Sequence, residues 1–409
     1  MIHYMKIAWN NILHSRRQTA ALSLLSLCAM TLMTIGAFLG NGLQGGLTRA
    51  VEPFDMLAGY GGSYQMVLNT VFLQDYPARN IPYRIVEEFE NDPRVRQAFP
   101  LAFGDNYMGY RIVGTDASLF SHYAKNDDPR PWLTCATGKP FSPESRDAVI
   151  GARVAADLGL RIGDTITTTH GFVQGGEEHA AEPYVVSGIL ASCRGPYDQA
   201  IFVDLQSVWD AHNNHDDDDD DAHAEQENDA HNDHDDRQTT AIMVKPAGLN
   251  EAYQLFTEFS ARNDADLVFP AQVVIRLLSI LGQADWLLQA IGFAAGGIAA
   301  LTIALSLYWA ASSRKDEALV LRLIGAERRD VLAILAWEGL FTIAPGIAAG
   351  RLAGHALLLV IAEVLERKAS LHVATGLSGV DFILGISLLL FGLLGEILAG
   401  LQMTRKKGK

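Results

Sequence analysis

The residues with the clearest capacity for chemistry lie in one stretch, 212–236, which is HNNHDDDDDDAHAEQENDAHNDHDD. It holds five His, ten Asp and two Glu in 25 residues, and no aliphatic side chain larger than Ala. Imidazole and carboxylate groups together suit Zn²⁺, with Ni²⁺ or Cu²⁺ as alternatives. The candidate metal ligands are His212, His215, His223, His231, His234, Asp216, Asp233 and Asp235.

The composition of this tract also limits how it can hold metal. Nothing in it can be buried, so it forms no packed core. Ordering it around one closed tetrahedral site would cost chain entropy, so we expect several ions that bind weakly and exchange quickly. The alternative is an acidic, solvated linker whose His residues are incidental. The choice depends on what surrounds the tract and on which side of a membrane it lies.

The rest of the sequence has the composition of a membrane protein, with 49% hydrophobic residues. A transmembrane helix needs about 20 mostly apolar residues. The first apolar run is longer than the apolar region of a cleaved signal peptide and follows a 17-residue lead, which favours a membrane anchor. We expect four transmembrane helices, at 19–42, 281–312, 331–362 and 381–404.

Lys and Arg gather in the segments that flank these spans. They precede the first span, occupy 313–330 between the second and third, and form the tail 405–409. Because such clusters favour the cytoplasm, residues 1–18, 313–330 and 405–409 are predicted to be cytoplasmic, with both termini inside. Residues 43–280 and the loop 363–380 then face outside. The net charge of −15 argues against nucleic acid as a partner.

The outer region 43–280 alternates helical and strand patterns, which predicts a mixed α/β domain. PYRIVEEFEND is expected to be a helix, VRQAFPLAF and YRIVGTD strands, and RVAADLGL a short helix closed by Gly159. The tract 212–236 interrupts a helix–strand connection, so it is an insertion in a loop. Cys135 and Cys193 both fall in this domain and could pair there, although two cysteines fix no pairing by spacing.

No catalytic constellation is present in the sequence. GxSxG, HExxH and the phosphate loop GxxxxGK[ST] are all missing, so we expect no enzyme activity, and any ATP is bound by another chain. His170, His179, Glu177 and Glu178 surround a hairpin tip that is best explained as solvated. Glu338, Arg351 and His355 lie in or beside the third span, where charges are often functional. The simpler interpretation places Glu338 near the cytoplasmic interface and turns Arg351 and His355 toward other helices.

The segment SRKDEALVLRLIGAERRD (313–330), here called the elbow, is rich in charge. Glu317, Leu321 and Ile324 share one face of a predicted helix, and Gly325 ends that helix so that a second can start toward the third span. This pattern suits docking on a cytoplasmic partner. The alternative is a plain loop whose cations lie near lipid headgroups.

The sequence resembles the FtsX/MacB-type (type VII) permeases of ABC transporters. MKIAWNNILHSRRQTAALSLLSL resembles the amphipathic helix that leads into the family's first span. VIGARVAADLGLRIGDTITTT, YVVSGILA and AIFVDLQSVW resemble its outer domain. RKDEALVLRLIGAERRDVLAILAWEGL resembles its coupling segment, with Glu317, Gly325, Ala326, Arg329 and Glu338 in matching places.

The resemblance implies four transmembrane helices, with a MacB-like α/β domain between the first and second, in a bacterial inner membrane. It implies a cytoplasmic ABC ATPase as partner, a dimer with itself or a paralogous permease, and a possible periplasmic metal-binding or adaptor protein. ATP would be used only by the partner, which would contact Glu317, Arg322, Gly325, Ala326, Arg328 and Arg329. The tract departs from the family pattern.

Three functions therefore remain open at this point. The first is a permease linked to metal handling, with zinc the expected ion. The second moves a lipoprotein, lipid, peptide or drug. The third is a mechanotransmitter that controls an outer enzyme.

Overall fold

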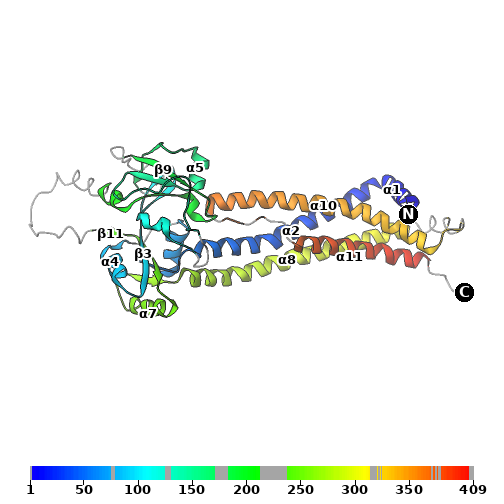
Figure 1. Cartoon of the computed structure of the whole chain (residues 1–409). Helices are drawn as coiled ribbons and strands as arrows, with labels where there is room; N and C mark the ends of the chain where they lie inside the picture. Colours follow the sequence, from blue (N-terminus) through cyan, green and yellow to red (C-terminus); the bar gives the residue numbers. More distant parts are fainter. Residues whose placement is uncertain are drawn as a thin grey trace, which may run out of the picture. The chain divides into compact units, whose positions relative to one another are not determined.

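The computed structural model describes residues 2–74, 79–124, 130–170, 183–211, 237–313, 320, 323, 325–369, 372–373, 375 and 379–404. The chain forms two compact units (Figure 1). The helical unit comprises Met1–Leu43, Ile280–Glu363 and Val373–Lys409. The α/β unit comprises Gln44–Ser279 and Val364–His372.

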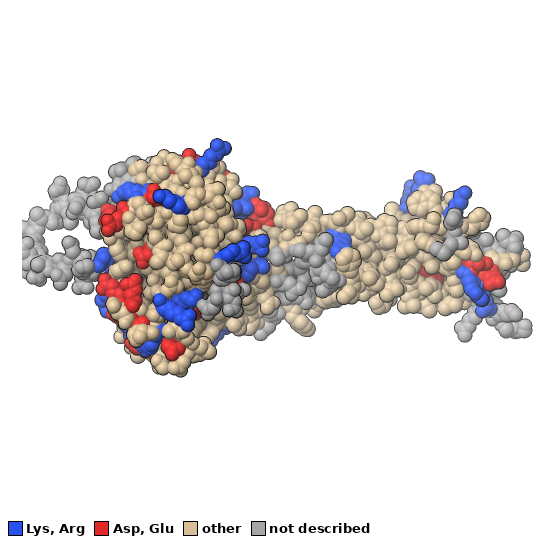
Figure 2. All heavy atoms as spheres, in the orientation of Figure 1, with Lys and Arg blue, Asp and Glu red and all other residues tan. Residues whose placement is uncertain are grey.

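Long helices account for the helical unit. They are α1 (Ile2–His14), α2 (Arg16–Val51), α8 (Pro270–Ser313), α10 (Arg328–Ala369) and α11 (Gly379–Thr404). Four apolar windows in the described helices are long enough to cross a membrane, at Arg16–Gly36, Gly296–Ser313, Arg328–Arg367 and Phe382–Gln402. On the face that Figure 2 shows, the described atoms in the middle of this unit include few from Lys, Arg, Asp or Glu, as a lipid-facing surface requires.

Three of these helices continue beyond the predicted ends of the spans. α2 runs on to Val51, α8 begins as early as Pro270, and α10 extends to Ala369 into the stretch expected to be a loop. A helix satisfies its own backbone hydrogen bonds, so leaving the membrane does not end it. The last turns of α10, VLERKA, are rich in good helix formers, which explains the continuation.

A row of glycines on α10 lets α2 approach closely. A Cβ at Gly346 would lie 2.3 Å from the Ser23 carbonyl oxygen, and one at Gly350 would lie 2.4 Å from that of Leu27. The Thr31 hydroxyl donates a 3.0 Å hydrogen bond to the Gly350 carbonyl. Small residues spaced by four are a common device for joining helices in membranes, where lipid offers no hydrophobic drive for association.

The α/β unit is built on one mixed sheet, and within the described residues it has eleven strands. The order is β13-β1-β12-β3-β4-β10-β6-β9-β5, with β7 paired to β9 and β8 to β3. The main strands are β1 (Met56–Gly59), β3 (Val95–Tyr107), β4 (Tyr110–Thr115), β5 (Cys135–Gly138), β6 (Asp147–Ile150), β9 (Tyr184–Leu190), β10 (Ala200–Asp204), β12 (Ala241–Pro246) and β13 (Asp266–Val268). Shorter strands are β7 (Thr165–Ile166), β8 (Thr169–His170) and the separate pair β2 (Ile81–Pro82) and β11 (Gln238–Thr239).

Two hydrophobic clusters fix the helices on this sheet. In the first, α4 (Arg84–Asn91) and α7 (Leu249–Phe259) pack on β1, β3 and β12, and Phe89 stacks on Phe259 with ring centroids 4.9 Å apart. In the second, Val154 of α5 (Ala152–Leu158) packs among residues of β6, β9 and β10. Each helix therefore buries its apolar face against the sheet.

Several local predictions are confirmed here. The helix α5 ends at Gly159, whose φ of +69° is the left-handed conformation that glycine adopts without strain. β10 leads directly into a helix over 205–211, and the tract 212–236 falls between that helix and β11. Cys135 and Cys193 are free thiols in the structure, so the pairing considered from the sequence is not formed.

An aromatic cluster in the α/β unit encloses a histidine. His122 is 1% exposed and lies against Phe99 and Trp132, with ring centroids 5.2 Å and 6.2 Å away. Its Nε2 is 2.9 Å from the Pro53 carbonyl oxygen, which only a protonated nitrogen can satisfy. Nδ1 is buried without a hydrogen-bond partner among the described residues. Burial lowers the pKa of His122 to about 4, so the ring is neutral at pH 7.

Candidate functional site

The described part of the elbow is a sharp turn that leads into α10. Gly325 has a φ of +103°, a conformation that L side chains rarely adopt. Three residues later α10 begins at Arg328. The Asp330 carboxylate reaches back to accept a 2.7 Å hydrogen bond from the Glu327 backbone N–H, which caps the helix. The predicted helix break at Gly325 is confirmed, and Ala326 lies within the turn that follows it.

The same carboxylate fastens α1 to the elbow. The Tyr4 hydroxyl donates a 2.6 Å hydrogen bond to Oδ1 of Asp330, while Oδ2 holds the Glu327 N–H. Because this hydrogen bond and the adjacent negative charge favour the protonated hydroxyl, they raise the pKa of Tyr4. We call Tyr4, Glu327 and Asp330 the clamp.

Two further contacts extend the attachment of α1 along α10. Trp9 packs edge-on against Phe341 with ring centroids 5.8 Å apart. The Asn11 side-chain amide donates a 3.3 Å hydrogen bond to Oε2 of Glu338. Glu338 therefore takes part in a contact between α1 and α10. Neither Tyr4 nor Asn11 was among the predicted site residues, although their spacing of seven places them on one helical face.

The outer surface of the elbow carries both charge and apolar side chains. Arg328 is exposed, and the Arg329 side chain is 91% exposed, with its Nε 4.0 Å from Oε2 of Glu327. Val320 is 57% exposed and Leu323 is 78% exposed. Exposed apolar residues rimmed by charge are typical of a protein-binding surface. Glu317 and Arg322, also predicted for this surface, lie outside the described residues.

The eight candidate metal ligands of the tract also lie outside the described residues: His212, His215, His223, His231, His234, Asp216, Asp233 and Asp235. Across the part of the chain that the structure does describe, no group of three or more His, Cys, Asp or Glu is placed to hold a metal ion. The metal prediction thus depends on the composition of the tract alone.

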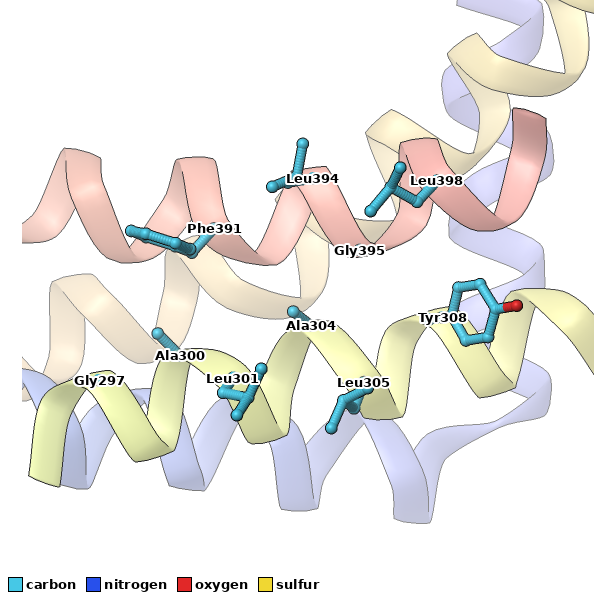
Figure 3. Close-up of a pocket in the computed structure, with 10 residues that line it drawn as sticks. All are labelled: Gly297, Ala300, Leu301, Ala304, Leu305, Tyr308, Phe391, Leu394, Gly395 and Leu398. Carbon is cyan, nitrogen blue, oxygen red and sulfur yellow. The ribbon is translucent and has the colours of Figure 1, made fainter. Parts of the chain in front are cut away.

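An apolar groove of about 590 Å³ lies between α8 and α11 (Figure 3). It is lined by Gly297, Ala300, Leu301, Ala304, Leu305, Tyr308, Phe391, Leu394, Gly395 and Leu398, none of which is charged. At its base Gly395 meets Ala304, where a Cβ would lie 2.3 Å from the carbonyl oxygen. The Tyr308 hydroxyl donates to the Gln402 side chain, so its polar end is satisfied. Apart from Tyr308, this lining holds no side chain that can do acid–base or nucleophilic chemistry.

Comparisons with known proteins agree with this architecture. Residues 21–254, more than half of the chain, match the MacB-like periplasmic core domain. Residues 290–407 match the FtsX-like permease C-terminal model. A comparison with curated proteins gives no match.

Two solved structures are similar to parts of the chain. One is the periplasmic region of MacB from Actinobacillus actinomycetemcomitans, at 8% identity and a TM-score of 0.34, covering 56% of this chain and 95% of that one. The other is the extracellular domain of the ABC-type transporter YknZ from Gram-positive bacteria, at 11% identity and a TM-score of 0.31, covering 52% and 98%.

The family matches extend over both the outer domain and the membrane helices in the order that the fold requires. Four apolar helices with a mixed α/β domain between the first and the later ones are the MacB-like layout. Such a chain is a non-catalytic, multi-pass inner-membrane subunit, and the ATPase activity lies in its partner. The chain belongs to the FtsX/MacB-type family of ABC transporter permeases.

Proposed function

We propose that this permease carries ATP-driven motion from a separate cytoplasmic ABC ATPase to its outer α/β domain. The observation that supports this most directly is the clamp, which joins the elbow, α1 and α10 into one hydrogen-bonded body. A partner that displaces the elbow would therefore displace two helices together. In this proposal both termini and the elbow are cytoplasmic, and the chain works as a dimer with itself or a paralogous permease.

α10 is suited to carry such a displacement. It is continuous from Arg328 at the elbow to Ala369, and its last residues belong to the α/β unit. A helix of 42 residues is about 63 Å long at about 1.5 Å per residue. No loop interrupts the helix, although Pro345 removes one of its backbone hydrogen bonds, so axial motion at one end is transmitted along its length. The chain then needs no nucleotide site of its own.

Gly325→Pro tests the docking role of the elbow. Proline fixes φ near −65°, which is incompatible with the +103° of Gly325, so the turn must change shape. We expect co-purification with the ATPase to fall about tenfold, as the loss of one well-placed surface would cause. The measurement is the amount of ATPase retained on the tagged, detergent-solubilised permease.

The matched control is Gly297→Ala, because a Cβ at this helical glycine meets no atom within 4 Å. This variant should retain the ATPase at the level of the natural sequence. Equal retention by Gly325→Pro would show that the elbow does not dock the partner.

We further propose that the tract links this permease to metal handling, with zinc as the ion. Its five His and twelve carboxylates support this, because imidazole with carboxylate is a donor set that Zn²⁺ prefers. The rival proposal is a permease for a lipoprotein, lipid, peptide or drug, or a mechanotransmitter for an outer enzyme, with an incidental tract. The position of the tract between a helix and β11 suits the capture or buffering of ions, since a long polar insertion in a connection disturbs the fold little.

Calorimetric titration of Zn²⁺ into the whole permease tests this link. We expect saturable binding of several ions at micromolar or tighter affinity. A variant with all five tract His replaced by Asn keeps the acidic charge and should lose that binding. If the natural permease and the five-His variant gave the same weak heats, the tract would be a solvated linker that does not bind zinc through its His residues.

A further inference from the structure

A second groove of the helical unit differs from the apolar groove in carrying positive charge. We call it the lateral groove. It lies among α2, α10 and α11 and has a volume of about 710 Å³, within the usual range of ligand sites. Its polar residues are Arg351 and His355, and the rest of the lining is apolar.

The charge lies at one end of the lateral groove. Along α10 the apolar residues Ala344 and Ile347 come first, and Arg351 and His355 follow one and two turns later. α11 gives the same order, since Arg351 lies over the ring of Phe382 while Leu389 is two turns further along. The groove therefore has a cationic head and an apolar tail.

The lengths of the helices from their first apolar residues indicate that the cationic head lies near a membrane surface, although the apolar window of α10 runs on to Arg367. Phe382 is the first residue of the apolar window of α11, which is 21 residues long and just spans a bilayer. Arg351 is level with Phe382, because its guanidinium carbon is 3.8 Å from the centroid of that ring. Arg351 also lies 23 residues after Arg328, or about 35 Å along the helix, which exceeds the hydrocarbon thickness of about 30 Å.

The Arg351 guanidinium is positioned by Phe382, and its N–H donors are available to a ligand. Stacking on Phe382 occupies one face of its plane, while its N–H donors point outward in that plane. Among the described residues no ion pair or hydrogen bond involves Arg351. A planar fork of donors at the headgroup level matches the oxygens of a phosphate.

We propose that the lateral groove binds one anionic phospholipid, with its phosphate on Arg351 and His355 and an acyl chain along Ile347 and Leu389. The cationic head and apolar tail of the groove match an anionic phospholipid better than they match other occupants. A free phosphate would leave the apolar tail empty, and an apolar helix from another chain would leave Arg351 uncompensated. The groove between α8 and α11 has no cation and should show no such preference.

Native mass spectrometry of the full-length permease tests this, with phosphatidylglycerol and phosphatidylcholine as probes. We expect one phosphatidylglycerol to bind about tenfold more tightly than phosphatidylcholine, the scale of one charge-assisted contact. Arg351→Gln should remove this preference. Lys6→Gln, which removes an exposed cation on α1, should keep it.

A second pair of variants tests the tail without touching the charge. Ala348 lines the groove and Ala349 does not, although both are exposed on α10. Ala348→Phe should weaken binding of both lipids several-fold, while Ala349→Phe leaves it unchanged. Equal binding of the two lipids by the natural protein would overturn the proposal. So would equal losses of lipid affinity in the Ala348→Phe and Ala349→Phe proteins, or a preference for phosphatidylglycerol that persists in the Arg351→Gln protein.

Discussion

Leucine in place of Gly350 is expected to force α2 and α10 apart and to lower the stability of the folded permease strongly. A Cβ there would lie 2.4 Å from the carbonyl oxygen and 2.9 Å from the Cα of Leu27. These are backbone atoms, so no rotamer change can relieve the overlap. Separation of the helices would also break the 3.0 Å bond from Thr31 to the Gly350 carbonyl.

The expected loss of stability is large because two free-energy costs add. Overpacking alone costs about 1–3 kcal/mol. In a membrane, separating the helices also forfeits the close van der Waals packing that holds them together, since lipid provides no hydrophobic drive. Against a total stability of about 5–15 kcal/mol, we expect the melting temperature in detergent to fall by about 10 °C or more.

Ala349→Leu is the matched control for this prediction. It adds the same side chain one residue away, at an exposed position on the same helix. Its melting temperature should stay close to that of the natural sequence. Equal melting temperatures for the Gly350→Leu and Ala349→Leu proteins would mean that α2 and α10 do not pack as the structure has them.

Much of the fold could be predicted from local patterns. The helix α5 and its end at Gly159 follow from an apolar period and a glycine. The strand β9 follows from an alternating pattern, and β10 from a short continuous apolar run. Long-range pairing could not be predicted in this way. β1 pairs with β12 although Met56 and its partner Val244 are far apart in sequence, and neither strand encodes the register by itself.

The candidate site shows the same division. The turn at Gly325 could be predicted, because glycine is the residue that ends helices in the left-handed conformation. The clamp could not, since the bond from Tyr4 to Asp330 joins side chains 326 residues apart. The glycines of α10 at 346, 350 and 354 have a spacing of four that is visible in the sequence and typical of close helix packing in membranes.

The α/β unit is expected to lose stability in acid through His122. The pKa of this ring is lowered to about 4 in the folded state, against about 6.5 when unfolded. The unfolded chain therefore binds the proton more tightly, so stability falls as the pH drops from 6.5 to 4. A shift of this size corresponds to about 3 kcal/mol, complete below the folded pKa.

Asp116 has the opposite effect on stability in acid, over an overlapping pH range. Burial, with help from the nearby charges of Glu90 and Asp204, raises its pKa to about 6. Its protonation is thus easier in the folded state, so it adds stability as the pH falls from 6 toward the ordinary value of an aspartate. The acid sensitivity of the natural protein sums these two contributions with those of other groups, such as Asp55 and Asp204, whose pKa values burial also raises. Single variants are needed to separate them.

His122→Gln separates them, because glutamine can still donate to the Pro53 carbonyl but does not titrate. We expect its melting temperature to fall less between pH 7.5 and pH 4.5 than that of the natural sequence. Asp116→Asn should fall more, since it loses the stabilising protonation while His122 remains. Parallel pH curves for the natural protein and the His122→Gln protein would mean that His122 is not held neutral in the fold, since a ring that is already charged or solvated has no proton uptake to couple to unfolding.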